Sequence, residues 1–266
     1  MVAQTRMGRV SYVPPQHGAW AFLALPLLVG ITCTTWQPAI ALLAGAWICA
    51  YPVSYFVMAA LGEHGRRNPR RRRFIRPTLP WLFGLLAFGI PLLLLDTWLI
   101  WVVLAMSMSA CVSAVFAVRH DQRAVVNDAV VIVQCSAMVP VTWAVGQVTA
   151  YWPPATVWWL TVLVALALAS STIHVRSFIR GRGDRTMARM AVVTPMIGMA
   201  CALIASAATG QARMSLIALA FAFDIARAIA LQQRASRGNT PKPMRIGMVE
   251  LVGFAIFVAT AALAQG

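Results

Sequence analysis

Long apolar segments separated by short polar loops follow one another along nearly the whole chain. A helix needs about 20 apolar residues to cross a bilayer, because every backbone polar group must be hydrogen-bonded internally there. Nine segments meet this requirement, and the divisions between them are weakest at Asp96 and Gly210. They are residues 18–35, 39–60, 78–95, 97–118, 126–146, 155–173, 190–208, 213–231 and 247–264. The pattern predicts an all-α, polytopic membrane protein with a single transmembrane domain over residues 1–266.

The composition supports a membrane environment. Of the 266 residues, 60% are hydrophobic and only 11% are charged, and the mean hydropathy is +0.75. Soluble domains average about 45–50% apolar and about 25% charged residues. The five cysteines lie within apolar segments and no two have a CxxC spacing, so they are interpreted as packing residues and not as metal ligands or disulfides.

The basic residues predict the orientation. The net charge is +15, and nine spans place 21 of the 22 lysines and arginines on one side, with only Arg213 on the other. Positive charge gathers in cytoplasmic loops. The N-terminal tail 1–17 and the loops 61–77, 174–189 and 232–246 are therefore predicted to be cytoplasmic, and the C-terminus to lie outside. Because orientation accounts for the charge, nucleic-acid binding is not expected.

Two groups of candidate functional residues lie where predicted spans begin. His17 follows a proline pair at the start of span 1, where it can bind an anion or shuttle a proton, or serve with Trp20 as an interfacial anchor. Arg123, Asn127 and Asp128 bring a cation, an amide and a carboxylate to the start of span 5. The alternative is structural, with Asn127 as a helix cap and Asp128 complementing the helix dipole.

A third group lies where span 6 leaves the membrane. The hydroxyl-rich run at 170–172 precedes His174, Arg176 and Arg180. Such a histidine within a polar, cationic helix end suggests a functional site. The alternative is ordinary loop charge whose arginines extend to the interface.

Charged residues also lie inside two spans. Asp224 and Arg227 are spaced i, i+3 in span 8 and can form an ion pair, and Glu250 lies four residues into span 9. Intramembrane charges are costly and usually mark a functional interior, although a purely structural pair is the alternative. The arginines of the 61–77 loop mainly determine topology and contact anionic lipid, and Arg76 among them is a substrate-binding candidate.

Several of these motifs resemble the YwiC-like family of bacterial membrane proteins. The resemblance rests on His17-Gly18-Ala19-Trp20, on 123–128, on 174–180 and on 246–250, and it extends over nearly the whole chain. It implies a protein of the bacterial cytoplasmic (inner) membrane.

A more distant resemblance is to the UbiA superfamily of intramembrane prenyltransferases. The polar loops follow spans 2, 4, 6 and 8, as in that family, and Arg73-Phe74-Ile75-Arg76-Pro77 resembles its basic segment before the third helix. The resemblance implies a nine-helix bundle and a transferase acting on an isoprenoid. UbiA enzymes bind Mg²⁺ through paired aspartate-rich motifs, whereas Glu63 and Asp184 are the only acids in the corresponding regions. Arginines are expected to neutralise phosphate there, with no obligatory metal or other cofactor.

The leading hypothesis is binding of, or chemistry on, an anionic lipid or isoprenoid at a cytoplasm-facing cavity. Transport or flipping of a small anion or lipid, with Asp224 and Arg227 as a gate, is the second hypothesis. A non-catalytic membrane assembly factor is the third. Proton handling is assigned to His174, Asp128 and His17, and substrate binding to Arg123, Asn127, Arg176, Arg180, Arg76, Asp224, Arg227 and Glu250.

The orientation can be measured with alkaline phosphatase fusions, because this enzyme is active only outside the cytoplasm. A fusion after Gly266 is expected to be active, and a fusion within 61–77 is expected to be inactive. The reverse pattern would place every candidate residue on the wrong side of the membrane.

Overall fold

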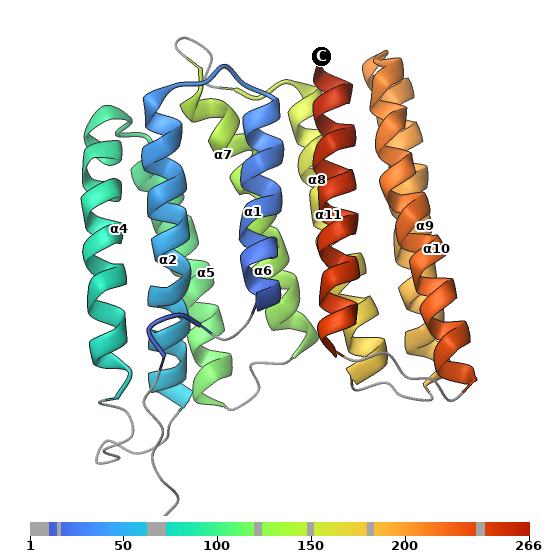
Figure 1. Ribbon diagram of the computed structural model, residues 1–266. Coiled ribbons are helices and arrows are strands. Elements are labelled where there is room, and N and C mark those ends of the chain that lie inside the picture. Colours follow the sequence, from blue (N-terminus) through green and yellow to red (C-terminus); the bar gives the residue numbers. More distant parts are fainter. Residues whose placement is uncertain are drawn as a thin grey trace, which may run out of the picture. The chain divides into compact units, whose positions relative to one another are not determined.

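The computed structural model describes residues 11–14, 17–62, 73–119, 124–147, 152–179, 184–237 and 243–266 (Figure 1). All regular structure within these ranges is helical. The helices are α1 (His17–Thr32), α2 (Pro38–Gly62), α4 (Ile75–Leu95), α5 (Leu99–Val118), α6 (Val125–Ser136), α7 (Met138–Val145), α8 (Ala155–Ile179), α9 (Arg185–Thr209), the 3₁₀ helix η1 (Ala212–Leu216), α10 (Ile217–Ser236) and α11 (Pro243–Gln265).

The prediction of an all-α, multi-span membrane protein is confirmed. Within the described ranges, eight helical segments of 20 to 25 residues are long and apolar enough to cross a membrane. They correspond to the predicted spans 2 to 9. The first predicted span, 18–35, contains a shorter apolar helix that ends at Thr32.

The fifth predicted span is divided into α6 and α7 at Ala137. Pro140 lies one turn after Ser136 and has no N–H to donate to the Ser136 carbonyl, which interrupts the helical hydrogen-bond series. The bonds on either side persist, from Ala137 N to Val133 O (3.0 Å) and from Val141 N to Ala137 O (3.3 Å). The interruption therefore changes the helix locally and leaves a continuous apolar segment, Val125–Val145.

The chain divides into two compact units. Unit 1 comprises Met1–Gln16 and Ala41–Asn127, and unit 2 comprises His17–Ile40 and Asp128–Gly266. In unit 1, small residues let α2 and α4 approach closely. A Cβ atom on Gly45 would lie 2.6 Å from the Phe88 ring, and one on Gly84 would lie 2.8 Å from the Cys49 sulfur. Such small-residue contacts are how membrane helices pack without a hydrophobic driving force between them.

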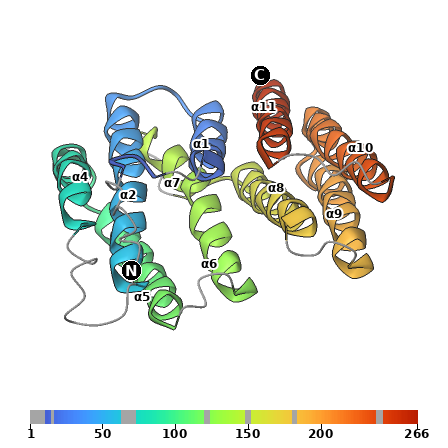
Figure 2. The same ribbon diagram turned by 60° about the horizontal axis from the view of Figure 1, so that its bottom comes forward.

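In unit 2, α1 packs against α7, α8 and α11, and α9 and α10 pack on each other (Figure 2). Gly30 of α1 faces Thr142 of α7, whose Cβ would lie 2.6 Å from a Cβ added to Gly30. Beyond these helices, the Gln147 side-chain amide donates a 2.9 Å hydrogen bond to Thr34 Oγ1. Close backbone contact and this hydrogen bond together fix α1 beside α7.

Several helix termini of unit 2 share one end, which we call the polar end. There α8 and α10 terminate, and α9 and α11 begin, at the bottom of Figure 1. Asp184 caps α9 at this end, because its Oδ1 accepts a 2.8 Å hydrogen bond from the Thr186 N–H. The predicted cytoplasmic loops 174–189 and 232–246 are too long, because α8 extends to Ile179, α9 begins at Arg185, α10 extends to Ser236 and α11 begins at Pro243.

Gly198 of α9 faces the ring of Phe221 in α10, and this contact gives a stability prediction. A Cβ on Gly198 would lie 2.3 Å from that ring, which is buried and held edge-on by Phe257 at 5.7 Å between centroids. Gly198→Ala is therefore expected to destabilise the protein by about 1–3 kcal/mol through overpacking. Thermal unfolding in one detergent would measure this loss.

Gly247→Ala is the matched control, since nothing lies within 4 Å of a Cβ at that helical position. It is expected to be neutral or slightly stabilising, because alanine favours helix more than glycine does. Equal stability of the two variants would show that α9 and α10 are not in contact at Gly198.

Candidate functional site

Four charged or titratable side chains meet in the interior of unit 2, and we call them the charged cluster: His174 of α8, Asp224 and Arg227 of α10, and Glu250 of α11. Arg227 Nη1 lies 2.8 Å from Glu250 Oε2, and Arg227 Nη2 lies 3.3 Å from Asp224 Oδ1. His174 Nε2 lies 3.9 Å from Glu250 Oε1. Three helices therefore bring together groups that are distant in the sequence.

The charged cluster is buried among membrane-spanning helices. His174 is fully buried, and Asp224, Arg227 and Glu250 are at most 8% exposed. Isolated charges at such depth cost several kcal/mol, and pairing offsets much of this cost. Arg227 supplies that pairing for both carboxylates.

Local sequence explains how α10 and α11 hold the cluster. Asp224 and Arg227 lie on the buried stripe of α10, between Phe221 and Leu231. Gly253 of α11 provides the space beside them, because a Cβ there would lie 2.9 Å from Asp224 Oδ1 and 3.4 Å from Arg227 Nη1. A larger side chain at this position would displace the ion pairs.

An apolar layer lies one turn closer to the polar end. It consists of Phe178 of α8, Leu231 of α10 and Ile246 of α11, which pack together and are buried. Each is four residues from the cluster member on its own helix, namely His174, Arg227 and Glu250 respectively. The Phe178 ring also packs edge-on against the His174 ring, at 5.1 Å between centroids. The apolar layer therefore separates the charged cluster from the polar end.

A second ion pair joins α8 to α6 near the polar end, with Arg176 placed between His174 and Phe178 along α8. Arg176 of α8 binds Asp128 in the first turn of α6, and both side chains are partly exposed. Two predicted candidates are thus partners of each other. Each neutralises the other, so Arg176 has little remaining charge for an external phosphate.

Of the remaining candidates, the structure describes the side chains of Arg76 and Asn127. Arg123 and Arg180 lie outside the described residues, as does the side chain of His17. Arg76 is exposed in the first turn of α4 in unit 1, and Asn127 lies in the first turn of α6. Their proposed roles remain predictions.

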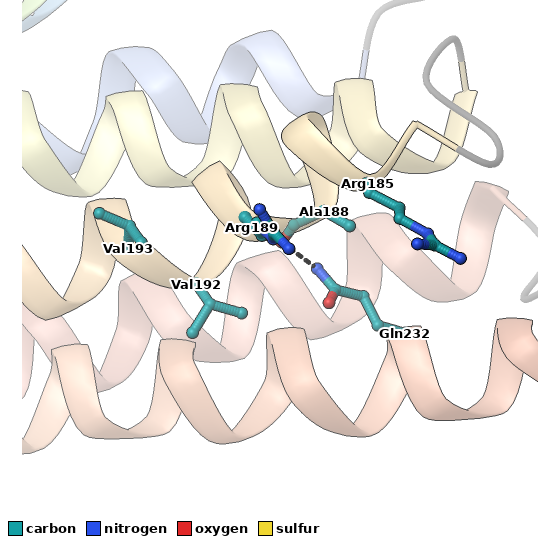
Figure 3. Close-up of a pocket in the computed structure, with 6 residues that line it drawn as sticks. All are labelled: Arg185, Ala188, Arg189, Val192, Val193 and Gln232. Carbon is teal, nitrogen blue, oxygen red and sulfur yellow. Dashed lines mark hydrogen bonds between the residues drawn. The ribbon is translucent and has the colours of Figure 1, made fainter.

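A pocket of about 430 Å³ lies between α9 and α10 and was not predicted from the sequence (Figure 3). Its polar lining comes from Arg185 and Arg189 of α9 and from Gln232 of α10, whose side-chain amide donates a 2.8 Å hydrogen bond to the Ala188 carbonyl. Val192 and Val193 line it further along α9. The i, i+4 spacing of the two arginines, followed by valines, was the sequence pattern that could have revealed it.

The two sites differ in the chemistry they can support. In the charged cluster, Arg227 is already paired with two carboxylates, which disfavours a phosphate there. In the pocket, by contrast, Arg185 and Arg189 are exposed, so their guanidinium groups can bind a phosphate through charge-assisted hydrogen bonds. Anion binding thus fits the pocket, and proton exchange fits the cluster.

Removing Arg227 is expected to destabilise the protein most among single cluster variants. Arg227→Gln leaves two buried carboxylates without their cation, and breaking a buried pair costs about 3–5 kcal/mol. Asp224→Asn is expected to cost less, since Arg227 keeps Glu250. The double variant Asp224→Asn/Arg227→Gln is expected to be more stable than the sum of the single losses implies. Unfolding in detergent would measure all three.

Arg213→Gln serves as the control because Arg213 is exposed in η1, at the opposite end of the same span. It is expected to change stability by less than about 0.5 kcal/mol. Equal losses for Arg213→Gln and Arg227→Gln, or additive losses in the double variant, would contradict pairing in the cluster.

Comparison with known sequences agrees with the resemblance noted from the motifs. The sequence profile of the YwiC-like protein family matches residues 13–143. The chain is 29% identical over 187 residues to the uncharacterized protein YwiC of Bacillus subtilis (strain 168), covering 66% of this chain and 70% of that relative. No solved structure gives a significant match. The predicted resemblance is confirmed, and the chain is a helical membrane protein similar to the YwiC-like family.

Proposed function

We propose that this protein binds a phosphate-bearing membrane lipid, either a phospholipid or an isoprenoid phosphate, in the pocket between α9 and α10. The observation that carries the proposal is the order of side chains along α9. Arg185 and Arg189 lie at the polar end, and Val192 and Val193 follow toward the interior of the span. A lipid has the same order, with its phosphate at the interface and its chain in the hydrocarbon layer.

Charge complementarity supports this occupant. Two exposed guanidinium groups can bind a phosphate through several N–H donors, each charge-assisted bond contributing about 1.5–3 kcal/mol. Asp184 is the neighbouring acid, but its carboxylate accepts hydrogen bonds from the first turn of α9. Its negative charge is therefore partly balanced by the helix N-terminus.

The orientation predicted from the loops determines which leaflet of the membrane the pocket would face. With the polar end in the cytoplasm, the pocket would take its lipid from the inner leaflet of the bacterial cytoplasmic membrane. Anionic lipids attract basic side chains at that surface. The proposal assigns phosphate recognition to arginine, so bound Mg²⁺ is not required. It concerns binding, and the prenyl transfer implied by the UbiA resemblance would be a further step.

Transport is the second candidate, and the charged cluster is the observation that favours it. Intramembrane ionisable groups commonly form the proton or substrate path of transporters. The apolar layer lies between the cluster and the polar end, as expected for a gated site. Lipid binding remains the first proposal because the pocket is open at the surface, while the cluster is closed.

The lipid proposal predicts that the double variant Arg185→Gln/Arg189→Gln loses bound anionic lipid. Protein would be purified from nanodiscs containing phosphatidylglycerol, a zwitterionic phospholipid and a polyprenyl phosphate, and the retained lipid identified by native mass spectrometry. Loss of one to two charge-assisted bonds is expected to lower retention about tenfold or more. The retained species would distinguish the phospholipid from the isoprenoid.

The control is Arg234→Gln/Arg237→Gln, which removes the same charge from exposed positions at the end of α10 outside the pocket. This variant is expected to retain the lipid. Equal loss in both variants would indicate general surface attraction and contradict the pocket. Loss of lipid on EDTA treatment, with recovery on adding Mg²⁺, would contradict recognition by arginine alone.

A further inference from the structure

We propose that His174 and Glu250 form a reversible proton-binding site, in which one proton is shared between the imidazole and the carboxylate. The site goes beyond the lipid pocket, which involves neither residue. Three observations support this proposal. The cluster has an unbalanced charge, the two oxygens of Glu250 face different partners, and an apolar layer covers the site.

The charge balance of the cluster favours one proton. Asp224 and Glu250 together carry two negative charges when ionised, and Arg227 carries one positive charge. With a neutral imidazole, the cluster has one negative charge in excess within a low-dielectric interior, where uncompensated charge is costly. One proton, on His174 or on Glu250, makes the cluster neutral.

The geometry directs that proton to one pair of atoms. Glu250 Oε2 is 2.8 Å from Arg227, while Oε1 faces His174 Nε2 at 3.9 Å. Among the residues that the structure describes, neither ring nitrogen of His174 has a hydrogen-bond partner. A proton between Nε2 and Oε1 would form an N–H···O or O–H···N bond after a movement of about 1 Å, since such bonds are about 2.7–3.0 Å long. Both ring nitrogens of His174 and the facing Glu250 Oε1 are therefore buried polar atoms without a described hydrogen bond, as is Arg227 Nε.

The described charged groups that face this pair both come from α10, and α8 adds a hydroxyl. Arg227 and Asp224 face it from α10, and Ser171 of α8 presents its hydroxyl to the Glu250 carboxylate. The Arg176–Asp128 ion pair lies two residues further along α8, on the opposite side of that helix from His174. The described charges of α9 at the polar end, Arg185 and Arg189, are exposed and line the lipid pocket.

The apolar layer controls access to the site. Phe178, Leu231 and Ile246 are buried between the cluster and the polar end, and Phe178 lies directly against the His174 ring. A proton from the polar end therefore reaches His174 only when this layer opens. Such an arrangement isolates a protonated site from the aqueous phase between uptake and release.

A purely structural cluster would differ in a measurable way. Structural polar networks in protein interiors complete the hydrogen bonds of their members. A shared proton instead couples the two residues, so each responds when the other is changed.

The chain allows this coupling to be observed with little overlap of signals. It contains only two glutamates, Glu63 and Glu250, and four histidines. Full-length Glu63→Gln protein in nanodiscs, labelled with ¹³C-glutamate and ¹⁵N-histidine, has a single glutamate carboxyl signal, that of Glu250. NMR spectra over a pH series report its protonation and that of His174, which is assigned from the loss of its signals in His174→Gln.

We expect the Glu250 carboxyl and the His174 nitrogens to change in the same pH steps. His174→Gln is expected to shift the midpoint for Glu250 by about 1 pH unit or more, as for coupled sites. The control Arg213→Gln, exposed at the opposite end of the span that carries Arg227, is expected to leave it unchanged. If His174→Gln does not fold, the Glu63→Gln protein alone still tests whether the two residues titrate together. Phe178→Ala, which opens the apolar layer, is expected to speed proton exchange at His174.

Two results would overturn the proposal. One is a Glu250 signal that stays constant over the whole pH range in which the protein is folded. The other is a Glu250 midpoint that His174→Gln leaves unchanged, which would show that the two residues do not share a proton. Neither result bears on the lipid pocket, which is tested separately by the double variant Arg185→Gln/Arg189→Gln.

Discussion

The ion pairs of Arg227 are the interaction on which the interior of unit 2 depends. Its guanidinium contacts Asp224 on its own helix and Glu250 on α11, so one cation stabilises two carboxylates and joins two membrane-spanning helices. In a membrane interior an acid without this cation would either carry an uncompensated charge, which is costly, or have to bind a proton. The pairing therefore determines which face of α10 points inward and where α11 packs against it.

Small residues make this arrangement sterically possible. Gly253 gives the ion pairs their space, and Gly198 lets α9 approach the Phe221 ring of α10. Because lipid tails are as apolar as the helices themselves, close packing and polar contacts hold such helices together. The charged cluster and the glycine contacts thus stabilise the same group of helices by different means.

The sequence predicted the fold class and eight of its nine spans, because hydrophobic length is a local property, whereas the first predicted span is a shorter apolar helix in the structure. It also predicted the Asp224–Arg227 pair, since an i, i+3 spacing on a helix is local too. It did not predict that Glu250 is the closer partner of Arg227, or that His174 faces Glu250, because both contacts depend on how α8, α10 and α11 pack. The break at Ala137 could have been predicted from Pro140. The pocket was missed because Arg185 and Arg189 were interpreted only as topology-determining charges, and the partner helix that supplies Gln232 is not evident from α9 alone.

The positions of the two sites on α10 relate them physically. Leu231 belongs to the apolar layer between the charged cluster and the polar end, and the next residue, Gln232, lines the pocket and binds the Ala188 carbonyl of α9. Consecutive residues of a helix move together. A displacement of this turn of α10 would therefore change both the apolar layer and the lining of the pocket. Arg227, one turn away, is held on two sides by carboxylates and resists such movement. The last turns of α10 are consequently where a change at the surface of unit 2 can reach its buried charges, while the ion pairs keep the rest of the helix in place.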